Sequence, residues 1–304
     1  MNAAPRRRVA PRKVTLDRSL EEVPLFRLSD TPDDAAVVFN TDAGGRWRVL
    51  PAPGDRLPGT FDQDVYVELM RRYRDADSPA DGALTFTLHA FLHSMGRRVD
   101  GRTYEQLRAA LFRLERTVIE SSAAYFLGGT GETVDTRFSV LSSVAIERRR
   151  ALDRSQFGLF DTSTSPDPGE VRAVLAPAIR ENIAARHTVT LSVSRYLGLS
   201  SPVARRLYRL LELARADGRL AWRVSLERLK ELLPLTQRYP SHLQRVLQPA
   251  HDLLLEAGIV RAAAMRQHNR RWYVDYVLGS RTPSMPDGGG PGGTPEDGGP
   301  EPAK

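Results

Sequence analysis

The chain has 304 residues and a formal net charge of +7 at pH 7, and arginine supplies most of its basic side chains. It contains no cysteine, which excludes a disulfide framework and a cysteine-based zinc site and fits a reducing cytoplasm. No apolar run approaches the ~18 residues of a membrane span, and no apolar segment follows the basic N-terminus as in a signal peptide. We therefore expect a cytoplasmic protein of two domains, without membrane association, whose arginines serve phosphate and base contacts.

Residues 1–22 mix basic side chains with Pro and Ala, and we expect them to form a disordered basic arm. Such an arm either follows phosphates and the minor groove or is only a solubilising end. The other end of the chain, residues 281–304, consists mainly of Gly, Pro and acidic residues. It cannot bury apolar area, so a disordered tail is expected there as well.

Residues 23–150 are expected to form a first domain. Its predicted elements are strands over 35–39 and 46–50, helices over 61–76, 88–95 and 103–116, and strands over 117–126 and 134–146 around a glycine turn. Helix, turn, helix and strand hairpin is the order of a winged helix-turn-helix domain. The polar side chains expected to face DNA at the start of its second helix are Arg102, Thr103, Glu105 and Arg108.

The same order of elements recurs in residues 151–280, the predicted second domain. The expected elements are a helix over 171–183 with a kink at Pro177, a strand over 187–193, helices over 202–216 and 226–233, a helix from Pro240, and strands over 259–265 and 271–278. Arg205, Arg206 and Arg209 crowd one face of the 202–216 helix, where they either touch phosphate or are solvated. The chain is therefore expected to be an α+β protein made of two tandem winged helix-turn-helix domains.

The helix that begins at Pro240 has two distinct faces. Leu243, Leu247 and Leu254 recur at helical spacing and form a buried stripe, while polar residues lie off the stripe in the first half. Pro249 should bend the helix, so that the first half can lie in a major groove. The alternative is a solvated face, but the neighbouring turn and hairpin favour DNA contact. The candidates for base contact are Arg238, Ser241, His242, Gln244, Arg245 and Gln248, and those for phosphate contact are Arg266, Arg270 and Arg271.

Several stretches resemble one family. Arg245-Val-Leu-Gln-Pro-Ala, preceded by the aromatic Tyr239, resembles the second recognition helix of iteron-plasmid replication initiators, and Ala204-Arg-Arg-Leu-Tyr-Arg-Leu-Leu resembles their RLYRLL segment. Val23-Pro-Leu-Phe-Arg-Leu and Leu57-Pro-Gly-Thr-Phe-Asp-Gln-Asp-Val resemble the opening of the replication initiator protein A family. The resemblance implies tandem winged-helix domains that bind origin repeats in double-stranded DNA, help open the duplex, and recruit the host initiator and helicase. It also implies a monomer that initiates and a homodimer that represses its own promoter.

Signals of catalysis are weak. Residues 54–60 have the spacing of a phosphate loop but lack its lysine, and His89 and His93 share a helix without a third metal ligand. His268 is alone, so the paired-histidine pattern of nickases is absent. We expect a protein that is not an enzyme and has no cofactor or metal. The alternatives are a winged-helix transcriptional regulator without a replication role, a DNA-cleaving or priming enzyme, and an adaptor that binds proteins.

Overall fold

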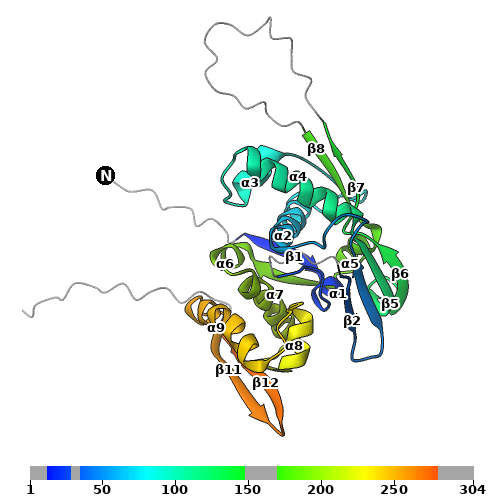
Figure 1. The fold of residues 1–304 in the computed structure, drawn as a ribbon. Helices are drawn as coiled ribbons and strands as arrows, with labels where there is room; N and C mark the ends of the chain where they lie inside the picture. The colour runs from blue at the N-terminus through cyan, green and yellow to red at the C-terminus, as the bar shows by residue number, and fades with distance from the viewer. Residues whose placement is uncertain (1–11, 29–34, 148–169, 280–304) are drawn as a thin grey trace, which may run out of the picture.

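The computed structural model describes residues 12–28, 35–147 and 170–279 (Figure 1). It is a mixed α/β protein in which the strands of the described residues form four antiparallel sheets. Among the described helices, none has the length and apolar character needed to cross a membrane. Two units with the same order of elements account for most of the fold, and a sheet and an N-terminal segment are added to them.

The first unit contains three helices and a three-stranded sheet. In chain order its elements are α2 (Thr60–Asp75), β4 (Ala83–Thr87), α3 (Leu88–Ser94), α4 (Gly101–Arg116), β7 (Leu141–Ile146) and β8 (Glu170–Leu175). The sheet order is β4-β8-β7, so the last strand lies between the other two. The apolar stripe of α4 packs on α2 and on β7.

The second unit repeats this arrangement. Its elements are α7 (Pro202–Ala216), β10 (Ala221–Ser225), α8 (Leu226–Leu232), α9 (Pro240–Glu256), β11 (Val260–His268) and β12 (Arg271–Leu278). The sheet order is β10-β12-β11, and again the last strand is central. The order of elements is therefore the same in both units. In the first unit, β4 matches the extended run predicted over 84–87 and β7 is the end of the strand predicted over 134–146, but β8 was not predicted as a strand.

The hairpin predicted for the first domain belongs to another sheet. β5 (Val118–Leu127) and β6 (Glu132–Phe138) pair with each other and join β2 (Val37–Asn40) and β3 (Arg46–Leu50) in the order β2-β3-β5-β6. The single strand predicted over 134–146 is wrong, because the chain turns at Ser139, whose hydroxyl donates to the carbonyl of Leu141 at 2.6 Å. Only the part beyond this turn, β7, returns to the first unit.

The N-terminal segment is ordered from residue 12. The prediction of a disordered arm through residue 22 is wrong for residues 12–22, which form β1 (Lys13–Asp17) and α1 (Arg18–Glu21); residues 1–11 lie outside the described residues. Val14 and Leu16 alternate with polar residues and are fully buried, which a composition argument overlooks. β1 pairs antiparallel with β9 (Thr188–Ser192), so the start of the chain is fixed to its second half.

The predicted domain boundary at residue 150 and the tail from residue 281 lie outside the described residues. Just after the predicted boundary, residues 170–175 form β8 and complete the first unit's sheet. The helix predicted over 171–183 is wrong in its first half. The helix there is α5 (Pro177–Ala184), and Pro177 starts it rather than kinking it, because its missing N–H costs nothing in the first turn.

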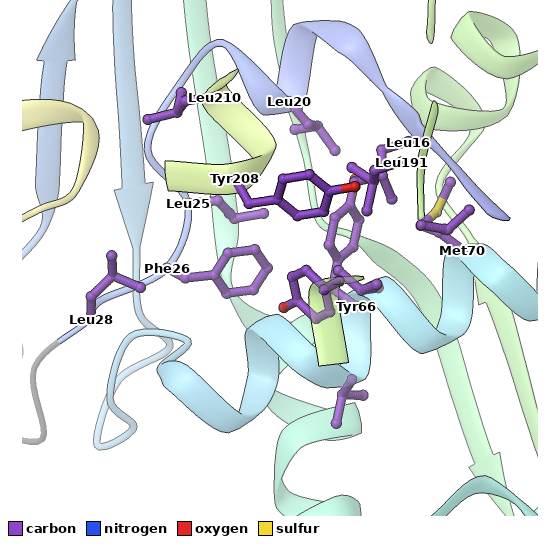
Figure 2. Packing of buried hydrophobic residues seen from close by; sticks show 14 of the residues in the cluster. Leu16, Leu20, Leu25, Phe26, Leu28, Tyr66, Met70, Leu191, Tyr208 and Leu210 are labelled. Atoms are coloured by element: carbon purple, nitrogen blue, oxygen red, sulfur yellow. The ribbon is translucent and has the colours of Figure 1, made fainter. Parts of the chain in front are cut away.

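One apolar core joins the two units. Figure 1 shows β1 and α1 between the helices of the first unit and those of the second. In Figure 2, Leu16, Phe26, Tyr66, Leu191 and Tyr208 point toward one another from β1, the segment after α1, α2, β9 and α7. All are at most 2 % exposed. The short helix α6 (Val193–Gly198) buries Val193 and Tyr196 in the same region.

Candidate nucleic-acid interface

The helix pair α8 and α9 in the second unit is built as the sequence predicts. Ser225 caps α8, since its hydroxyl accepts the N–H of Arg228 at 3.1 Å. α9 starts with Pro240 in its first turn and contains Pro249 without ending there. The buried stripe of α9 is confirmed for Leu243, Leu247, Ala250 and Leu254, which are at most 3 % exposed. Val246 and Leu253, also expected in the stripe, are half-buried, and Ala257 at its end is exposed, so that part of the prediction is wrong.

The opposite face of α9 is solvent-exposed along its first half. All six predicted base-contact candidates are exposed, namely Arg238, Ser241, His242, Gln244, Arg245 and Gln248. Gln248 donates its amide to the carboxylate of Asp252 at 2.8 Å, so that amide is partly occupied. Within the described ranges, Arg238 and Arg245 form no ion pair. These guanidinium groups are therefore free to bind a partner.

The hairpin β11–β12 carries further free cations. Arg266, Arg270 and Arg271 are exposed, and no carboxylate in the described part of the chain pairs with them. β11 runs to His268, three residues beyond its predicted end, so Arg266 lies on a strand rather than in the turn. The turn is only Asn269-Arg270, whose φ angles of 48° and 62° are the left-handed values that a tight two-residue hairpin requires.

The acidic side chains that neighbour this surface are on α9 and β12, and Asp275 interacts electrostatically with Arg266 as well as with Arg223. On α9 they are Asp252 and Glu256, in the second half of the helix. Asp275 on β12 accepts two bonds from Arg223 at 2.5 and 3.1 Å, and this interaction lowers the pKa of Asp275. We call the exposed first half of α9, the preceding Arg238 and the hairpin arginines the α9 surface. Within the described residues, Arg238, Arg245, Arg270 and Arg271 of this surface form no ion pair.

The corresponding helix of the first unit is a poorer candidate. Thr103 is half-buried and helps to start α4: its hydroxyl accepts the N–H of Asp100 at 3.1 Å, while Asp100 caps the helix. The predicted helix start at Thr103 is therefore wrong by two residues. Glu105 and Arg108 pair with each other, so their charges cancel. Of the four first-domain candidates, Arg102 alone is an exposed cation without an ion pair to a described residue.

The arginines of α7 are neither solvated nor available to phosphate, so that prediction is wrong. Arg206 and Arg209 are 2 % and 1 % exposed and surround Glu21, which is 0 % exposed. Arg209 donates to both carboxylate oxygens at 2.6 and 2.9 Å, and Arg206 to one of them at 3.0 Å. Burial lowers the pKa of Arg206 to about 10, so it remains a cation at neutral pH. We call these three residues the Glu21 cluster.

A second buried ion group joins α2 to the second half of the chain. Asp64 accepts the hydroxyl of Tyr196 at 2.9 Å and Arg97 at 2.7 Å, and it also pairs with Arg205. Arg205 therefore joins the second unit to α2, and Arg206 and Arg209 join it to the N-terminal segment. The sequence did indicate that Arg206 could be buried. It is three residues after Val203 and one before Leu207, both in the apolar stripe, so it lies at the edge of the buried face.

The described residues offer no evident metal centre. His89 and His93 are exposed and their rings stack with centroids 6.4 Å apart, but they bring no further ligand with them. Across residues 12–28, 35–147 and 170–279, no group of three or more His, Cys, Asp or Glu residues is placed to hold an ion.

Two solved structures have a fold similar to this one. The fold is similar to that of domains 2 and 3 of RctB, with a TM-score of 0.53 and 12 % identity over 85 % of this chain and 96 % of that one. It is equally similar to the Pi initiator protein, solved in complex with iteron DNA, with a TM-score of 0.53 and 14 % identity over 89 % of this chain and 99 % of that one. At these identities the likeness concerns the fold alone.

The family itself follows from the sequence match. Residues 16–237 match the model of the replication initiator protein A family, and the chain belongs to that family. A putative replication protein of Wigglesworthia glossinidia brevipalpis is 35 % identical over 75 residues. That match spans 23 % of this chain and 27 % of the relative's length. The resemblance drawn from the quoted sequence stretches is confirmed.

Proposed function

We propose that this replication initiator binds specific repeated sites in double-stranded origin DNA through two tandem winged helix-turn-helix modules. The modules are the first and second units. Both have the order helix, strand, helix, helix, strand, strand, and in both the last strand lies in the middle of the sheet. Its structural neighbour Pi has been crystallised with iteron DNA, which supports DNA repeats as the ligand. Two modules suit repeats of about 20 base pairs, or two helical turns.

The observation that carries the proposal is the contrast between two sets of arginines. Those on α7 are buried against carboxylates and serve the fold. Arg238, Arg245 and the hairpin arginines are exposed and unpaired within the part of the chain that is described. Guanidinium groups left without an internal carboxylate bind phosphate or the O6 and N7 atoms of guanine.

The α9 surface suggests a division of roles. Arg245 and Gln244, in the first half of the helix, are assigned to base edges, and Arg270 in the hairpin to phosphate. In the first unit, Arg102 supplies a weaker phosphate contact. The proposal extends to opening of the duplex, recruitment of the host initiator and helicase, and formation of a homodimer. It also includes a cytoplasmic location with the plasmid or nucleoid, and action without catalysis.

The test is a selection of bound sequences from randomised duplexes, followed by titration of the selected site. Arg245→Ala should weaken binding by about 1–3 kcal/mol and relax specificity at one base position. Arg270→Ala should weaken all sequences alike and reduce the slope of log K against log salt by about 0.9. Arg74→Ala is the matched control, because Arg74 is exposed on α2, away from the α9 surface. Equal behaviour of Arg245→Ala and Arg74→Ala would contradict the assignment.

Initiation is tested separately from binding. A plasmid that carries the gene and its neighbouring repeats should replicate with the wild-type protein and fail to do so with Arg245→Ala. A transcriptional regulator without a replication role would bind its site but would not support such a plasmid. Loss of replication without loss of binding in a further variant would then identify surfaces for host proteins.

A further inference from the structure

Tyr239 is an exposed aromatic residue within the α9 surface. Its side chain is 64 % exposed, and among the large apolar side chains exposed in the described residues it is the one aromatic ring. It directly precedes α9, between Arg238 and Pro240. The ring packs edge-to-face on the imidazole of His242, with centroids 5.6 Å apart and an interplanar angle of 83°. The ring therefore has one neighbouring ring, and solvent surrounds most of it.

The fold gives Tyr239 no structural task for its side chain. It contributes nothing to the apolar core, which lies on the opposite face of α9. It also makes no capping hydrogen bond, whereas Ser225 and Ser201 at the starts of α8 and α7 do so through their hydroxyls. Only its backbone carbonyl is used, accepting the N–H groups of His242 and Leu243 at 3.0 Å. A residue that breaks local rules in this way is expected where function requires it.

We propose that Tyr239 is a specificity-determining residue whose ring contacts the C5 methyl group of a thymine in the major groove. This inference rests on the proposed function, because it requires α9 to enter that groove. The N-terminal residues of a recognition helix contact base edges. In the major groove the thymine methyl is the apolar group that a base pair presents, and apolar side chains select it. The hairpin arginines, assigned to phosphate above, leave the ring free for a base contact.

The alternative for the same side chain is a hydrogen bond from its hydroxyl to a phosphate. The two contacts are separated by Tyr239→Phe, which keeps the ring and removes the hydroxyl. A thymine contact survives this change, whereas a phosphate contact is lost with it. Since the side chain is largely exposed, Tyr239→Ala and Tyr239→Phe should both keep the wild-type melting temperature.

The experiment uses the full chain and the duplex that it selects from a randomised library. Each thymine of that duplex is replaced in turn by uracil, which lacks only the methyl group, and affinity is measured by fluorescence anisotropy. For the wild type, one position should lose about fourfold in affinity, the value of one buried methyl group. Tyr239→Phe should show the same loss. Tyr239→Ala should bind the thymine duplex about fourfold more weakly and bind thymine and uracil equally well.

Leu255→Ala is the matched control, because Leu255 is an exposed apolar residue, 38 % exposed, in the second half of the same helix. It should retain the uracil effect of the wild type. The inference is overturned if no single uracil weakens the wild type, if Tyr239→Ala still distinguishes thymine from uracil, or if Tyr239→Phe behaves like Tyr239→Ala. Failure of the wild type to enrich any sequence would instead refute the proposed function. The uracil series on the wild type alone decides the matter if Tyr239→Ala does not fold.

Discussion

Glu21→Gln tests whether the Glu21 cluster, which joins the N-terminal segment to the second unit, stabilises the protein. The carboxylate is 0 % exposed and receives three guanidinium N–H bonds of 2.6 to 3.0 Å. Glutamine keeps one oxygen acceptor but turns an NH2 group toward guanidinium donors, and it leaves Arg206 and Arg209 buried without a counter-charge. Breaking a buried ion pair in this way costs about 3–5 kcal/mol. For a chain of this size we expect a melting temperature lower by roughly 6–20 °C.

The assay is thermal and urea unfolding followed by circular dichroism. Asp275→Asn is the control, because it removes the exposed ion pair with Arg223 and should change stability little. If Glu21→Gln is as stable as Asp275→Asn, the cluster does not stabilise the protein as argued here. A second measurement asks whether Arg206 contacts DNA. Because Arg206 is buried, Arg206→Met should leave the salt dependence of DNA binding by the folded protein unchanged. A reduced slope would mean that Arg206 reaches phosphate after all.

Three further predictions concern buried groups. Burial lowers the pKa of His251 to about 4, so its contribution to the free energy of unfolding is fully present above pH 6.5 and is lost, by up to ~3 kcal/mol, as the pH drops through 4. Urea titrations should give a smaller free energy of unfolding at pH 5 than at pH 7, and His251→Gln should reduce this difference. Burial raises the pKa of Asp17 to about 7, so the contribution of the protonated Asp17 to the free energy of unfolding is present below pH 3.8 and is lost as the pH rises through 7. In the same titrations Asp17→Asn should be less sensitive to pH over that range, and an unchanged profile would contradict a raised pKa. Gly45→Ala should destabilise strongly, because the new Cβ would lie 2.2 Å from the carbonyl oxygen of Ala123; a melting temperature equal to the wild type would refute this.

Apolar spacing predicted the buried face of an amphipathic helix where the opposite face is exposed, but not for α7, whose Arg206 and Arg209 are buried as well. The prediction holds for α9, where the stripe through Leu243 and Leu254 is confirmed and the predicted contact residues are exposed. The helix starts were less predictable. At Thr103 and at Thr60, residues that suit a cap lie inside the first turn, and Asp100 and Gly59 precede the helices instead. Several residues near a helix start can accept the same N–H groups, and sequence alone does not choose among them.

Long-range pairing could not be predicted from local patterns. The strands over 118–138 and 141–146 look alike in the sequence, yet one hairpin extends the β2–β3 sheet and the other strand joins β8. The roles of Arg206 and Arg209 depend on Glu21, which is more than 180 residues away in the chain. The stretches that carry the family resemblance meet at this place, since the Arg209 guanidinium lies over Phe26 at 5.5 Å. These stretches therefore reflect the joining of the units as well as any contact with DNA.

The pairing of β1 with β9 has a consequence during synthesis. Asp17 emerges from the ribosome 171 residues before its partner Thr188, which at typical rates corresponds to roughly 10–35 s of translation. Throughout that interval the apolar side chains of β1 are without the strand that covers them. The nascent chain therefore exposes an unpaired apolar strand over residues 13–17 until residues 188–192 have been made.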